Sequence, residues 1–271
     1  MRQSESTLLA LSRAEQEIAK RWSTRSRFAH VATLGATVIT LFAEGQGAYL
    51  AAFAAFVAQC AAWALRLIGD SKHSLAEEGR RRAVLADALA TPPDALAIRN
   101  LQARFSVAAR SLAPQLEDPD YYASTSPPGR ARLREHLQES AFWSRELYGA
   151  AAKVAYVGAA ALFVLVVGAL LLVVAAESPA ISLLVARLGV LFLSFLVGSD
   201  IVTQGLAWTD ASRKSDAVHG RLHAETLKDD GAALAVFGDY CVATATTPPI
   251  PTFVYRLHKN RIEEAWRSAA H

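Results

Sequence analysis

The stretch VAYVGAAALFVLVVGALLLVVAA, residues 154–176, decides the fold, because it holds 23 consecutive residues without a charge between Lys153 and Glu177. A helix that is apolar on every side lies either in a protein core or in a bilayer. A bilayer requires about 20 apolar residues in helical form, and this stretch supplies them. We therefore predict a transmembrane helix here, and the alternative is the core hairpin of a soluble helical bundle.

Three further apolar stretches predict three more spans. Residues 45–65 form an uncharged run of 21 residues. Residues 28–43 form a shorter run of 16. As a helix the shorter run reaches about 24 Å, so it requires a thinned bilayer or an extension through Arg27. The fourth span, from about 180 to 206, is interrupted by two charged residues.

The four spans pair into two hairpins, 28–68 and 153–206, and the surrounding charges predict their orientation. The reversing turns, AEGQG at 43–47 and ESPA at 177–180, contain Gly or Pro, which end helices, and no Lys or Arg. The other flanks are basic, with Lys20, Arg21, Arg25, Arg27, Arg66, Lys72, Arg145, Lys153, Arg213 and Lys214. The positive-inside rule then places both termini and the segment 69–152 in the cytoplasm.

The composition excludes several classes of protein. The chain has 271 residues and a net charge of only +3, which excludes a strongly basic nucleic-acid binder, so no nucleic-acid polymer is expected as a partner. Two distant cysteines, Cys60 and Cys241, exclude a disulfide framework and an all-cysteine zinc site. Residues 1–27 are polar and do not resemble a signal peptide. The mean hydropathy of +0.20 is high for a soluble chain and low for one wholly inside lipid.

The segment between the hairpins is predicted to be helical, because Ala, Leu, Arg and Glu dominate it. We expect a first helix that is interrupted at Gly79 and a second over about 94–113, closed by Pro114. A loop follows over 116–129. A third helix begins near Arg130 and continues into the third span as one rod.

The predicted architecture is an all-α membrane protein with two transmembrane helical hairpins and an α-helical cytoplasmic cap. The C-terminal part is expected to be helical until Ala243, and a Pro-rich elbow and an amphipathic helix follow. The predicted segments are a cytoplasmic N-terminal amphipathic helix (1–27), the first hairpin (28–68), a cytoplasmic helical insert (69–152), the second hairpin (153–206) and a cytoplasmic C-terminal segment (207–271).

No pattern of catalytic residues stands out. The sequence has no Gly-rich phosphate loop, nucleophile elbow or kinase-type lysine pattern. His219 and His223 have an i,i+4 spacing that can bind metal, but no third ligand is evident. We therefore expect neither an enzyme nor a metal or cofactor site.

Two charged residues in the fourth span are candidates for a pore lining or a subunit contact. Arg187 and Asp200, with Ser194 between them, would give this helix a semi-polar face, and charges inside a span are costly enough to indicate a use. The alternative is that both side chains reach the headgroups at the two ends of the span.

The cytoplasmic segments hold two further candidate sites. The run Arg80, Arg81 and Arg82 suits phosphate recognition, and Arg99, Arg104 and Arg110 lie beyond it. The alternatives are anchoring on the positive side or contact with anionic lipid headgroups. Just before the third span, Glu139, Phe142 and Trp143 are a candidate coupling collar, which packing of the cap explains equally well.

Several local stretches resemble a known family. Asp120–Ser124 reads DYYAS and is followed by Gly129, LQESAFW occupies 137–143, and PPIP at 248–251 is followed by Tyr255 and Trp266. With the layout of two hairpins around a helical insert, these stretches are similar to the S-4TM family, four-transmembrane effectors associated with bacterial nucleotide second-messenger synthases.

The resemblance implies an anti-phage effector of the bacterial inner membrane, and it carries no catalytic residue set. A partner nucleotidyltransferase would supply a cyclic or oligomeric nucleotide, and the protein would bind it, form a homo-oligomer or open, and disrupt the membrane. Tyr121 and Tyr122 would then stack on the ligand that the three arginines bind. The alternative functions are a non-conducting membrane scaffold that recruits a partner through its cap and, last, a constitutive transporter.

Overall fold

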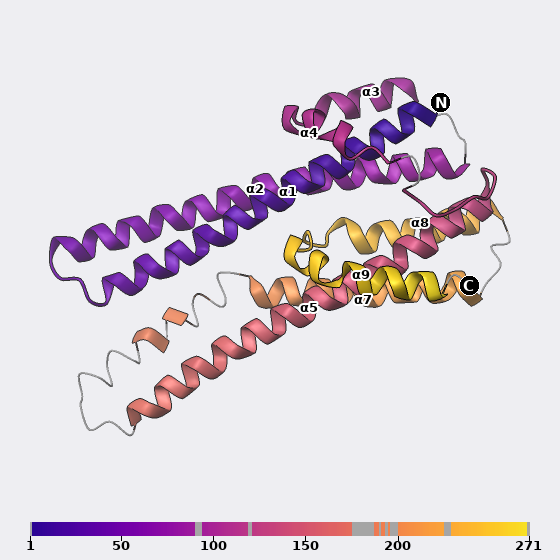
Figure 1. The fold of residues 1–271 in the computed structure, drawn as a ribbon. Coiled ribbons are helices and arrows are strands. Elements are labelled where there is room, and N and C mark those ends of the chain that lie inside the picture. The colour runs from indigo at the N-terminus through magenta and orange to yellow at the C-terminus, as the bar shows by residue number, and fades with distance from the viewer. Residues whose placement is uncertain are drawn as a thin grey trace. The chain divides into compact units, whose positions relative to one another are not determined.

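The chain folds into helices only, as far as the structure describes it. The computed structural model describes residues 2–89, 94–118, 121–174, 187–189, 191–192, 195, 200–224 and 229–269. Its helices are α1 (Arg2–Thr40), α2 (Gln46–Leu89), α3 (Ala95–Arg104), α4 (Val107–Leu112), the 3-10 helix η1 (Ala113–Gln115), α5 (Arg130–Val174), α7 (Ile201–Ala224), α8 (Asp230–Ala245) and α9 (Thr252–Ala269) (Figure 1). The predicted all-α class is confirmed, and so is the continuous rod from Arg130, which is α5.

The helices build two compact units. Unit 1 comprises Met1–Arg21, Gly69–Ala151 and Ala207–His271, and unit 2 comprises Trp22–Ile68 and Ala152–Leu206. The helices α1, α2, α5 and α7 contribute residues to both units, whereas α3, α4, η1, α8 and α9 belong to unit 1 alone.

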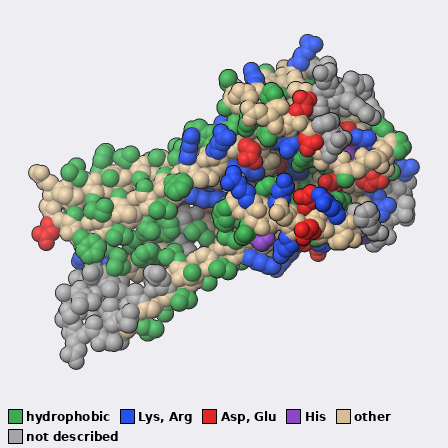
Figure 2. Space-filling model, viewed as in Figure 1, with side chains coloured by type: hydrophobic (Ala, Val, Ile, Leu, Met, Phe, Trp, Pro, Cys, Tyr) green, Lys and Arg blue, Asp and Glu red, His purple; other side chains and the backbone are tan. Residues whose placement is uncertain are grey.

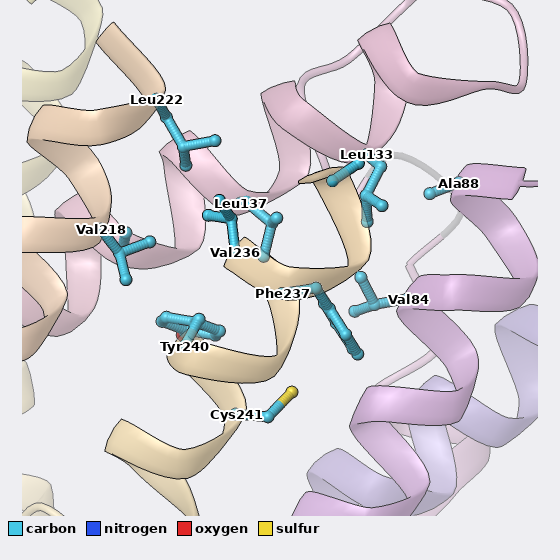
Figure 3. Packing of buried hydrophobic residues seen from close by; sticks show 12 residues of the cluster. Val84, Ala88, Leu133, Leu137, Val218, Leu222, Val236, Phe237, Tyr240 and Cys241 are labelled. Carbon is cyan, nitrogen blue, oxygen red and sulfur yellow. The ribbon is translucent and has the colours of Figure 1, made fainter. Parts of the chain in front are cut away.

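The core of unit 1 forms where α2, α5, α7 and α8 meet. Phe237 and Cys241 of α8 point toward α2, where Val84 and Ala88 are buried (Figure 3). The other buried members are Leu133, Leu137 and Ala141 of α5, Val218 and Leu222 of α7, and Ala233, Val236 and Tyr240 of α8. A second cluster joins Phe142 and Leu147 of α5 to Ile262 of α9. Burial of these side chains supplies the main driving force for folding of unit 1.

Gly79 does not interrupt its helix, so that prediction is wrong. It lies inside the last third of α2 and is buried, because α1 and the end of α3 approach it closely. A Cβ atom at this position would stand 2.3 Å from the Ser12 hydroxyl oxygen and 2.8 Å from Cζ of Phe105. The glycine therefore allows close packing of helices.

Gly79→Ala should destabilise unit 1, because Ser12 and the Phe105 ring must shift to admit the methyl group. Overpacking of this kind costs about 1–3 kcal/mol. The control is Gly220→Ala in α7, where a Cβ meets open space and the loss of glycine should instead stabilise by about 0.5–1 kcal/mol. Circular dichroism melts of the purified chain in detergent measure both. An equal effect of the two substitutions would contradict the packing role.

The predicted helix over 94–113 is also wrong, because it breaks between α3 and α4. Ser106 has an extended backbone and caps α4, its hydroxyl accepting from Ala109 N at 3.2 Å. Its own N–H and hydroxyl donate to the buried carboxylate of Glu15 in α1, at 3.0 and 2.8 Å. Lys72 of α2 pairs with the other oxygen of Glu15 at 2.9 Å. The break therefore lets Ser106 donate two hydrogen bonds to the buried, charged carboxylate of Glu15.

The C-terminal part likewise contains a helix start that the sequence reading missed. Helix α7 ends at Ala224, and α8 begins at Asp230 and ends at Ala245 rather than at Ala243. Asp229 has an extended backbone, and its carboxylate accepts from Ala232 N at 2.7 Å. It is therefore an N-cap, which starts a new helix.

Unit 2 contains an antiparallel hairpin of α1 and α2 (Figure 1). Gly45, with a φ of +56°, lies in the turn between the two helices, at the place where the sequence predicts a reversal. The Ser26 hydroxyl of α1 donates to the Ala62 carbonyl of α2 at 2.8 Å. Gly205 of α7 lets the Tyr156 ring of α5 approach, since a Cβ there would stand 3.1 Å from Cε1.

Candidate functional site

Unit 2 exposes large apolar side chains, whereas unit 1 is rich in charged ones. Figure 2 shows hydrophobic side chains gathered over the α1–α2 hairpin and Lys, Arg, Asp and Glu gathered over unit 1. Large side chains that are at least 60% exposed in the hairpin are Phe28, Phe42, Tyr49, Leu50, Phe53, Phe56 and Trp63. Exposure of such large apolar side chains to water is unfavourable. A surface of this kind is typical of a contact with a membrane or with another protein.

Two helices of the described part are long and apolar enough to cross a membrane, Gln46–Leu89 and Arg130–Val164. In the most apolar 18-residue window of the first, only 6% of the residues are buried, and in that of the second 33%. The core helix of a soluble protein would be mostly buried, so this alternative fits neither helix. The predicted first and fourth spans are not among these two helices, and both stay predictions.

A cluster of polar side chains lies within this apolar unit. Arg66 of α2 forms an ion pair with Asp200, which directly precedes α7. Arg27 of α1 donates to the Gln204 side chain of α7 at 3.5 Å. His30 of α1 lies within hydrogen-bonding reach of Gln59 of α2. We refer to these six residues as the polar cluster of unit 2.

The polar cluster accounts for one of the predicted pore residues and leaves two outside it. Asp200 has a partner within its own chain, and its φ of +55° is one that side chains other than Gly rarely adopt. Arg187 is exposed and in a helical stretch. Ser194 lies outside the described residues. The sequence predicted Arg27 as a basic flank or an extension of the first span and Arg66 as a basic flank, and their positions at the span ends were the available signal.

The predicted arginine run contributes one residue to a buried polar network of unit 1. Arg80 Nη2 pairs with Glu77 Oε2 at 2.8 Å, and its Nη1 donates to the Tyr240 hydroxyl at 3.3 Å. Tyr240 also lies 2.9 Å from the Ser144 hydroxyl and donates to the Ser140 carbonyl. Nε of Arg80 is buried and has no hydrogen bond, so the guanidinium depends on Glu77 for its charge balance.

The electrostatics of this network favour a charged Glu77. Although burial alone would raise the pKa of Glu77, the Arg80 guanidinium, with a smaller contribution from His73, lowers it below the usual value of 4.5. Burial also lowers the pKa of His73, whose two ring nitrogens are buried without a hydrogen bond. At neutral pH the network therefore holds one carboxylate, one guanidinium and a neutral imidazole.

The other arginines of the run point elsewhere. Arg82 pairs with Glu78 at 2.8 Å, and Arg104 of α3 pairs with the same carboxylate at 2.9 Å. Arg81 has a buried Nε without a hydrogen bond and lies near Cys241. The three side chains therefore do not form one phosphate-binding surface.

The two predicted stacking tyrosines lie in different environments. Tyr121 is 37% exposed, and the Arg13 guanidinium lies 4.7 Å from the centre of its ring. Tyr122 packs against the main core, with its ring 4.1 Å from that of His136. Its hydroxyl faces Ser140 without a hydrogen bond of ordinary geometry, and burial raises its pKa well above the usual value. Tyr121 is the more exposed of the two, and the Arg13 guanidinium lies over its ring.

The predicted collar residues all pack inside unit 1. Glu139 accepts a hydrogen bond from Ala123 N at 3.1 Å, and burial raises its pKa. Phe142 is buried 5.3 Å from the Trp266 ring of α9, and Trp143 packs against the same cluster. These contacts are those that the packing alternative predicts, and a coupling role stays a prediction.

A groove in unit 1 has room for a small ligand. Its volume is about 530 Å³, within the range of small-molecule sites. Apolar and polar residues line it together: Thr7, Ala10, Leu11, Arg99, Gln102, Ala103, Arg110, Ala113, Pro114 and Glu117. Arg110 donates to the Ala103 carbonyl at 2.9 Å, whereas Arg99 has no ion-pair partner among the residues described.

Metal ligands do not gather in the part of the chain that the structure describes. In the described ranges no group of three or more His, Cys, Asp or Glu side chains lies close enough to hold a metal ion. His219 and His223 contact each other edge to face, with ring centres 4.7 Å apart. Comparisons with protein-family models, curated proteins and solved structures gave no match.

Proposed function

We propose that this chain is a membrane-embedded effector that conducts ions or disrupts the bilayer when a ligand binds its helical unit 1. The observation that carries the proposal is the pairing of exposed apolar helices with a charged cluster in the same unit. Charged groups within membrane segments are costly, and they commonly mark an ion path or a subunit contact. Four spans, a homo-oligomer and the bacterial inner membrane, with both termini cytoplasmic, belong to the same proposal.

The groove around Arg99 is the ligand site that we propose, in place of the arginine run. Arg80 and Arg82 already have carboxylate partners, whereas Arg99 lines a cavity and has no ion-pair partner among the described residues. Apolar lining residues accommodate a base, and a guanidinium binds a phosphate. The resemblance in the sequence favours a cyclic or oligomeric nucleotide, made by a partner nucleotidyltransferase, as this anion.

Purified protein in liposomes tests the function. We expect release of a trapped dye or ion only when one member of a panel of cyclic di- and trinucleotides is added. The alternative is a non-conducting scaffold, which predicts silent liposomes with every nucleotide while the protein stays inserted. Retention of the chain in the membrane pellet after an alkaline carbonate wash separates this outcome from a failure to insert.

Arg99→Ala should weaken nucleotide binding about tenfold or more, since a hydrogen bond to a charged group contributes about 1.5–3 kcal/mol. Arg104→Ala is the matched control, because it removes an exposed arginine from the same helix that pairs with Glu78 and does not line the groove. Isothermal titration of both variants with the nucleotide that opens the liposomes measures the difference. Equal losses in the two variants would place the site elsewhere.

A further inference from the structure

The first half of α9 exposes an apolar and basic surface. Phe253 is 57% exposed and Leu257 71% exposed, and they stand one helical turn apart. Three exposed cations accompany them, Arg256, Lys259 and Arg261. We refer to these five residues as the α9 surface.

The α9 surface is held outward by contacts on the opposite side of the helix. Val254 and Ile262 are fully buried, and Ile262 packs with Phe142 of α5. Trp266 contacts the same Phe142 ring at 5.3 Å between ring centres. The helix therefore has apolar side chains on two sides. One side packs in the core of unit 1, and the other exposes Phe253 and Leu257 to solvent.

Two of the three cations of this surface have no acidic partner among the described residues, and the third has a distant one. Arg256 and Lys259 have no ion pair among the described residues, and the carboxylate nearest to Arg261 is that of Glu146, at 3.9 Å. The acidic residues of α9 come later in the helix, where Glu263 pairs with Arg267 at 2.6 Å. Positive charge next to exposed aromatic and aliphatic side chains complements an anionic lipid surface.

Two contacts within unit 1 tie the chain around the start of α9 to residues at the ends of unit 1 segments. The Trp208 indole donates to the Pro248 carbonyl at 2.9 Å, and Trp208 stands next to Ala207, where a segment of unit 1 begins. The Lys20 ammonium lies 5.7 Å from the centre of the Tyr255 ring, and Lys20 stands next to Arg21, where the first segment ends. Since each residue of a helix advances the chain by only about 1.5 Å, Lys20 and Trp208 lie very close to the points where these segments of unit 1 end and begin.

We propose that the α9 surface binds the phosphate groups of anionic lipids, with Phe253 and Leu257 inserted at the headgroup level. This inference rests on the proposed insertion of unit 2 in a bilayer, since Lys20 and Trp208, which contact Tyr255 and Pro248, each stand one residue from an end of a unit 1 segment. A basic amphipathic helix in this position anchors unit 1 to the membrane beside its spans.

Fluorescence of the full chain in liposomes tests the proposal. In a Cys60→Ser background, Leu257→Cys carries an environment-sensitive dye, and Leu96→Cys, an exposed leucine of α3, carries it in the control. We expect the dye at 257 to shift to the blue and to be shielded from an aqueous quencher in vesicles with phosphatidylglycerol. The combined substitution Arg256→Gln, Lys259→Gln and Arg261→Gln should abolish the shielding, and the dye at 96 should stay quenched.

The outcomes separate this inference from the membrane proposal. Equal quenching at 257 and 96, in protein that resists alkaline carbonate, would overturn the α9 surface and leave the insertion intact. Shielding at 257 that is the same in pure phosphatidylcholine would overturn recognition of anionic headgroups. Release of the chain by carbonate would overturn the insertion and this inference together.

Discussion

Glu77→Ala is expected to lower the midpoint of thermal unfolding of unit 1 by on the order of 10 °C, because about 3–5 kcal/mol is lost when one partner of a buried ion pair is removed. Glu77 is 3% exposed, and without it the Arg80 guanidinium keeps its hydrogen bond to Tyr240 but no counter-charge. Circular dichroism of the full chain in detergent measures the change.

Glu78→Ala is the matched control for this prediction. Glu78 is the next residue of the same helix and contacts two arginines, Arg82 and Arg104, yet its side chain is 33% exposed. Exposed ion pairs contribute about 0–1 kcal/mol, so its loss should shift the midpoint by a few degrees at most. Comparable shifts in the two variants would show that the Glu77 pair contributes no more than a surface pair.

The same carboxylate gives a pH dependence with a defined sign. Since Arg80 lowers the pKa of Glu77 in spite of its burial, the folded chain keeps this carboxylate ionised where the unfolded chain protonates it. The contribution of this carboxylate to the free energy of unfolding is complete above its usual pKa of 4.5. It is lost as the pH falls through the lower pKa of the folded state. Glu77→Gln should remove this part of the acid dependence.

Hydropathy runs were sufficient to predict the two long apolar helices α2 and α5, because each run depends only on its own residues. The two wrong predictions in the segment 69–152, at Gly79 and at Ser106, arose because these residues depend on distant parts of the chain. Gly79 depends on Ser12 and Phe105, and the break at Ser106 depends on the buried Glu15, which is 91 residues away. Contacts of this kind arise from packing between distant segments, and composition carries no trace of them.

The candidate sites also divide into contacts that local spacing predicts and contacts that depend on distant segments. Consecutive residues of a helix point in different directions, so the run from Arg80 to Arg82 could not act as one surface. The pairs Glu77–Arg80 and Glu78–Arg82 have i,i+3 and i,i+4 spacings and were readable from the sequence. The pair Arg66–Asp200 was not, because nothing local relates α2 to the start of α7.

Asp200→Asn is expected to raise ion flux without ligand about tenfold in liposomes. The Arg66–Asp200 pair joins α2 to the residue that precedes α7, and both side chains are partly exposed, at 40% and 29%. In water, a pair with this exposure contributes about 0–1 kcal/mol. Loss of the pair in a membrane environment approaches the 1.4 kcal/mol that changes a population tenfold. If the paired state is the closed one, the open state gains accordingly.

The charge-swapped variant Arg66→Asp with Asp200→Arg separates the pair from the individual charges. It restores an attractive pair in the reverse direction, so basal flux should return toward that of the original chain, while Arg66→Asp alone should leak more than Asp200→Asn. Equal amounts of inserted protein, measured after a carbonate wash, make the fluxes comparable. If the swapped variant leaked as much as the sum of its single substitutions, the two side chains would act independently. Silence in every variant, with protein inserted, would favour the scaffold, because a chain that conducts no ions has no gate for this pair to close.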